Sequence, residues 1–200
     1  MSAPQIRYQC LCFCDGQQEA LYLKHLAKLL KTDSRRVTFT LKEMPRKNNF
    51  EARGIAYDKA ALFDHDNKPE LFKEKLNACA KSKCFYAYSN LDFDLWLLLH
   101  KRDFAAPVHK NDAYVQHVRD SFALDEEADI KNAAIMADKI LPGIALSDVK
   151  DAIRRADKIR AHKLPSDALQ TGTIKYFHNP DLHIHEFIKK VFAECGEPIE

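Results

Sequence analysis

Two aspartates one residue apart, Asp64 and Asp66, follow directly after an apolar run from Ala60 to Phe63. A short apolar run bounded by turn residues is typical of a buried strand. Divalent ions such as Mg²⁺ prefer hard oxygen ligands, and they are often held by one or two carboxylates plus substrate phosphates. The pair is therefore a candidate metal site, and the alternative is an exposed loop, because Asp and Asn favour turn conformations.

A third carboxylate, Asp15, follows a strand-like segment at residues 6–14. If the two strands are neighbours in a parallel sheet, their carboxyl ends meet at one edge, where α/β proteins place ligands. Asp15 would then join Asp64 and Asp66 as a third metal ligand, or act as a general base on the attacking water. Glu19 could take over this role from the start of the next helix. The alternatives are a turn residue at position 15 and an ordinary helix-dipole interaction at position 19.

Apolar patterning predicts alternating strands and helices in the first half of the chain. Strands are expected at residues 6–14, 36–42, 57–63 and 84–88, and helices at residues 17–30, 69–81 and 93–100. From residue 111 onward only helices are expected, at residues 111–122, 130–140, 147–160 and 184–193. This order indicates an α/β fold with a mostly parallel sheet flanked by helices. We expect an α/β core over residues 1–105 and a helical C-terminal extension, residues 106–200, packed on that core.

The composition fits a chain that buries a substantial core, with 46% hydrophobic and 30% charged residues. The net charge of +2 neither demands nor excludes a nucleic acid, because local basic patches matter more than the sum. No apolar stretch approaches the length of a membrane helix, and the N-terminus does not have the pattern of a signal peptide. We therefore expect a cytoplasmic protein that does not bind membranes.

Two other residue types that bind metals show no metal-binding pattern. The six cysteines include no Cys-x-x-Cys pair, so we expect reduced thiols that act as small core residues. His178, His183 and His185 have no acidic or cysteine partner at a standard spacing, so they are interpreted as surface histidines.

Three segments resemble one protein family. Residues 89–100, Ser-Asn-Leu-Asp-Phe-Asp-Leu-Trp-Leu-Leu-Leu-His, resemble the signature Ser-Asn-Pro-x-Phe-Glu-x-Trp-Leu-Leu-Leu-His of RloB-like proteins. Residues 15–23 resemble the Glu-Gly-x-x-Thr-Glu-x-x-Tyr-Phe segment of that family, one residue shorter and without the Thr. Asn179-Pro180 and the helical pattern after it resemble the closing segment of the family. Asp15 and Asp94 stand where the family has Glu.

The acidic residues also resemble those of the Toprim domain, the metal-binding fold of topoisomerases, primases and related nucleases. That fold has a Glu-Gly turn after its first strand, matched here by Asp15-Gly16, and a later Asp-x-Asp pair, matched by Asp64 and Asp66. The two resemblances imply a nuclease associated with phage defence and abortive infection, which hydrolyses phosphodiester bonds in RNA or DNA with Mg²⁺ or Mn²⁺. They also imply a separate ATPase as partner, since this chain has no Gly-x-x-x-x-Gly-Lys loop.

Other readings of the resemblance stay open. Aspartate in place of glutamate at positions 15 and 94 favours a module with weak or no catalysis that binds a nucleotide, a nucleic acid or a partner protein. Phosphoryl transfer on a small nucleotide is a third possibility. The apolar helical tail could also serve a homodimer.

Four residues near the expected site are candidate substrate contacts. Ser89 and Asn90 would border the metal site, or else cap the following helix. Asp94 would face the cleft from that helix. His100 would donate to a phosphate or act as an acid, with an ordinary histidine at a helix end as the alternative.

A basic stripe on a later helix is a candidate phosphate-binding surface. Arg154, Arg155 and Lys158 lie close together on the helix, and basic residues continue to Lys163. The alternative is a solvated helix face. The basic loop at residues 44–51 is a second candidate.

Overall fold

The computed structural model describes residues 6–45, 50, 58–110 and 112–199. The main strands are β1 (Ile6–Cys14), β2 (Arg35–Glu43), β3 (Asp58–Asp64) and β4 (Phe85–Ser89). The helices are α1 (Gln17–Leu29), α2 (Pro69–Lys81), α3 (Asp94–Leu99), α4 (Val115–Ser121), α5 (Ala133–Ile135), α6 (Leu146–Ala161) and α7 (Ile184–Cys195). Short helical turns η1 (Met136–Ile140), η2 (Leu141–Gly143) and η3 (Pro165–Asp167) and two short strands, β5 (Leu169–Thr171) and β6 (Ile174–Tyr176), complete the described elements.

The four main strands form one parallel sheet in the order β2-β1-β3-β4. Cys14 at the end of β1 lies opposite Leu62 of β3, and Asp64 at the end of β3 lies opposite Ser89 of β4. All four strands therefore end at the same edge of the sheet. The predicted α/β fold with a parallel sheet flanked by helices is confirmed.

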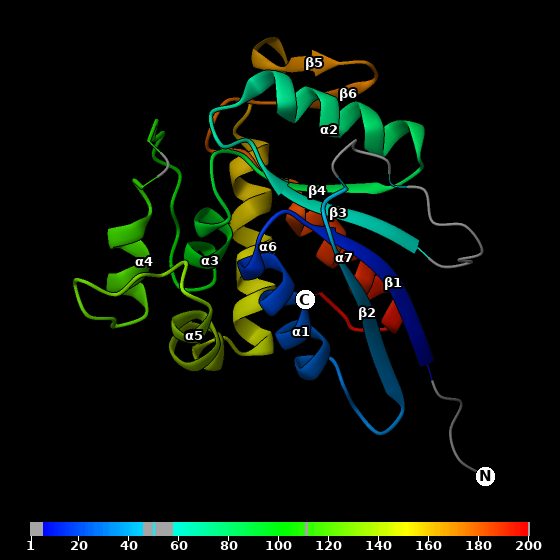
Figure 1. Ribbon diagram of the computed structural model, residues 1–200, viewed down its shortest axis with the longest axis vertical. Coiled ribbons are helices and arrows are strands. Elements are labelled where there is room, and N and C mark those ends of the chain that lie inside the picture. The colour runs from blue at the N-terminus through cyan, green and yellow to red at the C-terminus, as the bar shows by residue number, and fades with distance from the viewer. Residues whose placement is uncertain (1–5, 46–49, 51–57, 111, 200) are drawn as a thin grey trace.

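Helical layers cover both faces of this sheet (Figure 1). Helices α1, α6 and α7 lie on one side, and α2 lies on the other side together with the antiparallel β5–β6 hairpin. Ala60 and Leu62 of β3 belong to the apolar core on the α1 side, whereas Ala61 and Phe63 belong to the core on the α2 side. This division follows from the two-residue period of a strand.

Helices α3 and α6 show two ways in which the sequence buries a helix. All six residues of α3 are buried, because the helix packs between α4 and α6. Helix α6 is amphipathic and buries one stripe, made of Val149, Ala152, Ile153, Ala156 and Ile159. Helix α7, from the C-terminal half of the chain, contacts β4, β1 and β2 and so completes the core on the α1 side.

The described part of the chain departs from the sequence prediction in the C-terminal half. The helix expected at residues 130–140 begins only at Ala133 and continues as a π-helical turn from Met136. The β5–β6 hairpin lies where no strand was predicted, because strands of three residues are too short to show a two-residue pattern. The division of the chain at residue 105 stays a prediction.

The prediction that the cysteines are small core residues is confirmed. All six cysteines are buried and unpaired, and Cys10, Cys12 and Cys14 share one face of β1. None of the helices in the described ranges is long and apolar enough to cross a membrane.

Ile153→Ala is expected to lower the free energy of unfolding by about 2–5 kcal/mol, because it leaves a cavity beneath α6. Arg154→Ala is the matched control. It removes an exposed side chain paired with Asp151 and should cost less than about 1 kcal/mol. Urea unfolding followed by circular dichroism measures both, and equal losses would contradict the assigned orientation of α6.

Candidate active site

A cleft of about 490 Å³ opens at the edge where the strands end. Five carboxylates and three lysines line it; the carboxylates are Asp15, Glu19, Asp64, Asp66 and Asp92, and the lysines are Lys68, Lys75 and Lys131. We call this the acidic cleft. It brings together all four residues that the sequence suggested as catalytic, because the segments after β1 and β3 lie side by side.

Backbone contacts hold the two strand ends in place. The Asp15 N–H donates to the Leu62 carbonyl at 3.0 Å, so β1 continues alongside β3 into the turn. Beyond β3, the Asp66 N–H donates to the Leu91 carbonyl at 3.2 Å, and Asp66 adopts a positive φ of 56°. Asp and Asn tolerate this left-handed conformation better than most residues, which explains the acidic turn after β3.

Glu19 lies in the first turn of α1 and is buried, with 4% of its surface exposed. Burial raises its pKa to about 7, with smaller contributions from the charges of Asp15 and Asp92, while hydrogen bonds to the Glu19 and Gly16 backbones lower it. A Cβ at position 16 would lie 2.9 Å from the Glu19 Oε2. Glycine at position 16 therefore leaves room for the Glu19 carboxyl to fold back against the turn before α1.

Asp64 interacts electrostatically with Glu19 and with two further carboxyl groups, those of Asp92 and Asp94. Burial raises the pKa of Asp64 well above its usual range, and the charges of Glu19, Asp92 and Asp94 raise it further. Burial and the charge of Asp92 raise the pKa of Asp94 to about 7. Gln18 donates to the Asp94 Oδ1 at 3.2 Å, whereas the Asp94 Oδ2 has no hydrogen-bond partner in the described residues. This inner group is a set of hard oxygen donors that repel one another.

Lysines pair with three carboxylates of the cleft. The buried Lys75 lies 2.5 Å from Asp15, and Lys68 lies 3.0 Å from Asp66. Lys131 lies 2.6 Å from Asp92 and lowers its pKa, although burial has the larger effect and the net shift is upward. Asp15 is thus neutralised by a lysine from α2, which the sequence did not suggest.

The three predicted metal ligands Asp15, Asp64 and Asp66 line the same cleft but are not tightly clustered. In the described residues, the ligand atoms of three candidate side chains come within 4.8 Å of one another only at Asp157, His185 and Glu186. Asp15 and Asp66 instead face their lysines. Their role as metal ligands stays a prediction.

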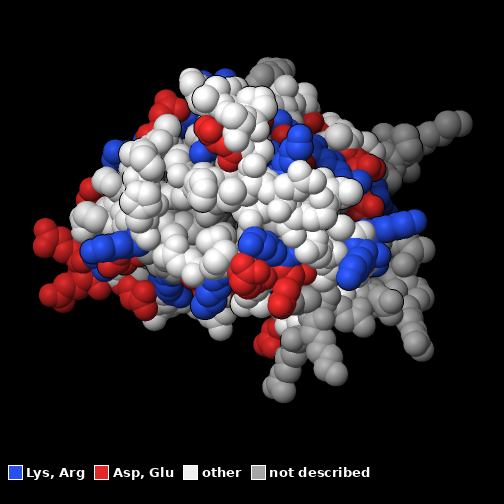
Figure 2. Space-filling view, turned by 90° about the horizontal axis from the view of Figure 1, so that it is seen from above, with Lys and Arg blue, Asp and Glu red and all other residues white. Residues whose placement is uncertain are grey.

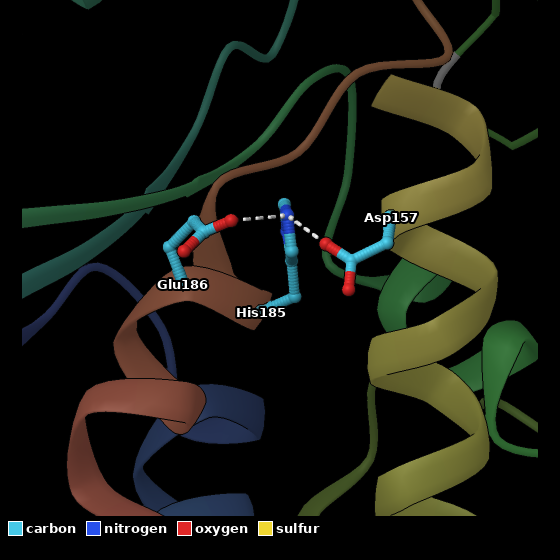
Figure 3. Close-up of side chains that lie close together, drawn as sticks. All are labelled: Asp157, His185 and Glu186. Carbon is cyan, nitrogen blue, oxygen red and sulfur yellow. Dashed lines mark ion pairs between the residues drawn. The ribbon is translucent and has the colours of Figure 1, made fainter. Parts of the chain in front are cut away.

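The cluster of Asp157, His185 and Glu186 joins α6 to α7, away from the acidic cleft (Figure 3). The His185 Nε2 lies 3.5 Å from Asp157 and 3.2 Å from Glu186. The Lys189 ammonium lies 2.6 Å from the same Asp157 oxygen and 3.1 Å from Glu186, and so already supplies a cation to both acids. The arrangement is an ion-pair network between two helices.

The prediction of surface histidines is right for one histidine and wrong for another. His178 is exposed, but His185 is buried, with 1% of its surface exposed. Its partner Asp157 comes from another helix, so no spacing along the sequence could have indicated the contact. His183 is half-buried beside the Tyr86 carbonyl, and burial lowers its pKa to about 4.

Ser89 and Asn90 make internal hydrogen bonds in the loop between β4 and α3. The Ser89 Oγ donates to the Asp92 carbonyl at 2.6 Å, and the Asn90 Nδ2 donates to the Phe177 carbonyl at 2.6 Å. Neither residue caps α3, whose N-cap is Phe93. The helix-capping alternative is therefore wrong, and the two side chains hold in place the loop that carries Asp92. Their role in substrate binding stays a prediction.

His100 ends α3 in the core. Its Nδ1 lies 2.8 Å from the Trp96 carbonyl and its Nε2 lies 3.1 Å from the Tyr22 hydroxyl. Burial lowers its pKa to about 4, so the ring is uncharged at neutral pH. This surrounding agrees with the alternative of a histidine at a helix end, and its role as a phosphate donor or acid stays a prediction.

The residues of the basic stripe on α6 have different partners. Arg154 is paired with Asp151, Arg155 donates to the Leu99 carbonyl at 2.7 Å, and the Lys158 side chain is 68% exposed. Figure 2 shows a different face, seen from above on the side of α2 and the β5–β6 hairpin, where basic and acidic residues lie around a largely uncharged area. Arg46 and Lys47 of the second basic candidate lie outside the described residues.

Sequence reasoning missed Asp92, Lys75 and Lys131 as residues of the cleft. Asp92 lies inside the segment that resembles the family signature, so its position was a usable signal. The lysines had no such signal, because Lys75 reads as an ordinary polar residue of α2 and Lys131 lies in a loop far along the chain.

Asp94→Asn should stabilise the metal-free protein at about pH 8 and have little effect near pH 4. The pKa of Asp94 is raised in the folded state, so the folded protein keeps a proton that the unfolded chain releases between the ordinary carboxyl pKa and about 7. This contribution to stability is lost as the pH rises through that window. The expected gain at high pH is on the order of 1–3 kcal/mol, at roughly 1.4 kcal/mol per pKa unit.

Urea unfolding in EDTA at both pH values measures this difference. Asp138→Asn, which changes an exposed aspartate of η1, is the control and should show no pH-dependent gain. An equal effect of Asp94→Asn at both pH values would contradict a raised pKa.

The chain was compared with protein families, curated proteins and solved structures. No curated protein and no solved structure matches it. One family model, described as RloB-like protein, matches residues 10–191, a span that includes the C-terminal half of β1, the acidic cleft and most of α7. The family resemblance seen in the three sequence segments is confirmed, and the chain belongs to the RloB-like protein family.

Proposed function

We propose that this RloB-like protein is a metal-dependent phosphodiesterase that cleaves nucleic acid at the acidic cleft. The main support is the convergence of Glu19, Asp64, Asp92 and Asp94 where the strands of a parallel sheet end, which is where α/β proteins bind ligands. Groups of buried carboxyl groups with raised pKa values are typical of functional sites.

The donor atoms of this set of side chains are of the type that divalent cations bind, although no three of them lie within 4.8 Å of one another in the described residues. The donors are carboxylate oxygens, which suit Mg²⁺ and Mn²⁺. The Asp94 Oδ2 is buried without a hydrogen-bond partner in the described residues, and a nearby positive charge would compensate it. Asp64 and Asp92 would hold the cation and leave Glu19 free to act as a base, while Asp15 and Asp66 stay candidate ligands.

The side chains around the cleft suit phosphodiester hydrolysis. A bound cation would neutralise phosphate charge and stabilise the departing oxygen. Lys68 and Lys131 offer N–H donors to phosphate oxygens at the rim. Glu19, with a pKa of about 7, can take up or release a proton near neutral pH, as a general base for the attacking water must.

The family resemblance adds four more specific properties to the proposal. They are a Toprim-related fold, a role as a phage-defence effector that acts in abortive infection, a location in the cytoplasm and cooperation with a separate ATPase. The parallel sheet with acidic residues after β1 and β3 is compatible with a Toprim-type site.

A binding module without turnover is the second candidate. The observation that favours it is the 2.5 Å ion pair between Asp15 and the buried Lys75, which occupies the residue expected to act as base or ligand. Such a module would bind a nucleotide, a nucleic acid or a partner protein at the same cleft.

Mn²⁺ should raise the melting temperature of the wild-type protein at about pH 8 and much less near pH 5, because protons compete with the metal for raised-pKa carboxylates. At a concentration of about 100 times the Kd the stabilisation is about 2.7 kcal/mol, which corresponds to several degrees for a chain of this size. Asp64→Asn should lose most of this shift. Glu70→Gln, an exposed acid outside the cleft, should keep it.

Cleavage of labelled single-stranded RNA, duplex RNA, transfer RNA and DNA should require Mg²⁺ or Mn²⁺ and stop in EDTA. Asp64→Asn should slow cleavage by roughly 100-fold or more, because it removes a central carboxylate. Glu70→Gln is again the matched control and should leave the rate unchanged.

The outcomes separate the two candidate functions. Binding of these nucleic acids with no turnover in either metal would support the binding module. Cleavage that persists in EDTA or in Asp64→Asn would overturn the metal-dependent mechanism.

A further inference from the structure

A second cavity, of about 580 Å³, opens between the C-terminal half of α6, the segment after α3 and the turn at Asn179-Pro180. Its volume lies in the range of small-molecule binding sites. None of its lining residues lines the acidic cleft. The cavity includes the Asn-Pro segment that resembles the closing part of the family pattern, for which the proposed function gives no role.

The lining of this cavity combines an apolar floor with cationic side chains. Phe104, Ile159 and Pro180 contribute to the floor. The rim carries Arg155 and Lys158, which lie one turn apart on α6, with Lys163 just beyond the end of the helix. Apolar and aromatic surface beside positive charge matches a ligand with a flat apolar part and an anionic part.

The acid at this rim binds the cations only weakly. Asp103 is 73% exposed, and it lies 3.7 Å from the Arg155 Nε and 3.9 Å from the Lys158 Nζ. Exposed pairs at such distances contribute between about 0 and 1 kcal/mol. Lys158 is therefore available to an anionic ligand, together with the N–H groups of Arg155 that are not donated to the Leu99 carbonyl.

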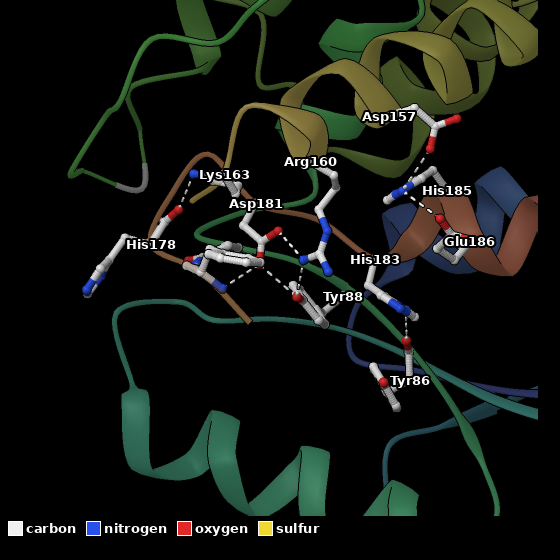
Figure 4. A network of polar contacts seen from close by, with 12 residues as sticks. Tyr86, Tyr88, Asp157, Arg160, Lys163, His178, Asp181, His183, His185 and Glu186 are labelled. Carbon is white, nitrogen blue, oxygen red and sulfur yellow. Dashed lines mark hydrogen bonds and ion pairs between the residues drawn. The ribbon is translucent and has the colours of Figure 1, made fainter. Parts of the chain in front are cut away.

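Other cations of the basic stripe are occupied elsewhere. Arg154 pairs with Asp151, outside the cavity. Arg160 donates to Asp181 at 2.6 Å and to the Tyr88 hydroxyl at 3.3 Å, and Figure 4 shows it pointing toward these two residues. Arg154 and Arg160 thus have close acidic partners outside the cavity, whereas Arg155 lies 3.9 Å from Asp151 and lines the cavity with Lys158.

Hydrogen bonds hold the walls of the cavity in a fixed arrangement. The Asn179 Nδ2 donates to the Val108 carbonyl at 2.8 Å, and the Tyr114 hydroxyl donates to the Asn179 Oδ1 at 3.0 Å. The Phe104 ring packs edge to face against Tyr114, with ring centroids 5.5 Å apart. Lys163 donates to the His178 carbonyl at 2.8 Å, as Figure 4 shows. A fixed cavity lowers the entropy cost of ordering a ligand.

We propose that this second cavity binds a nucleotide, with the base against Phe104, Ile159 and Pro180 and the phosphate on Arg155 and Lys158. The nucleotide is either free or one unit of a single strand, since both present the same chemistry. Stacking on an aromatic side chain contributes about 1–3 kcal/mol per base, and it tolerates any sequence. The inference extends the proposed function by a second contact with the same class of substrate, but binding here does not require cleavage.

The test measures binding of adenosine monophosphate and of a fluorescein-labelled oligouridine in EDTA, where the metal-free acidic cleft repels phosphate. Arg155→Gln with Lys158→Gln should weaken binding about tenfold, and it should lower the slope of log K against log salt by about 1.4, since two phosphate contacts are lost. Arg154→Gln, the neighbouring basic residue outside the cavity, is the control and should change binding less than about twofold.

Two further variants keep the result interpretable. Lys158→Gln alone changes a side chain that is 68% exposed, so it should fold normally and still weaken binding. Phe104→Leu should weaken binding without changing the salt slope, because it removes stacking and no charge.

The outcomes distinguish a free nucleotide from one unit of a strand, and they separate a failure of the proposed function from a failure of the nucleotide site. Loss of monophosphate binding in the double variant supports a free nucleotide, and loss of oligouridine binding alone supports a strand. Equal effects of Arg154→Gln and the double variant, or no effect of either, would overturn the cavity as a nucleotide site. If no nucleic acid is cleaved but the double variant still weakens binding, the proposed function fails and this inference stands.

Discussion

Carboxylates brought out of water repel one another, and this protein holds Glu19, Asp64 and Asp94 close enough for their charges and burial to raise pKa values. The parallel sheet causes this, because β1 and β3 are neighbours that end at one edge. The loop after β4 then folds back, fixed by the bond from the Ser89 Oγ to the Asp92 carbonyl. Backbone and hydroxyl hydrogen bonds thus position charges that would otherwise separate.

The lysines around the cleft compensate the charge of some of its acids and not of others. Lys75 and Lys131 neutralise Asp15 and Asp92, whereas the Asp94 Oδ2 farther inside has no partner in the described residues. A buried carboxylate without a compensating positive charge destabilises the folded protein unless the carboxylate is protonated or binds a cation. This difference between the acids paired with lysines and the unpaired carboxyl oxygen of Asp94 is the physical basis for the proposed metal chemistry.

Helix α6 connects the core with the second cavity. Its apolar stripe, which includes Ile153, packs in the core, while Ile159 at the end of that stripe reaches the floor of the cavity. The same helix presents Arg155 and Lys158 beside that floor. A helix period of 3.6 residues allows both, since residues three and four apart share a face.

The sequence by itself determined the main elements, the acidic pair after β3, the buried cysteines and the family. These properties depend on local periodicity and on segments read along the chain. Only the tertiary structure decided that Lys75 neutralises Asp15, that Lys131 reaches Asp92 and that His185 is buried beside Asp157. The partners in these pairs lie 28 to 60 positions apart in the sequence. Asp15 and Lys75 are separated by 60 positions, and His185 and Asp157 lie on different helices, α7 and α6. Contacts of this kind follow from how helices pack on the sheet, and no periodicity in the sequence encodes them.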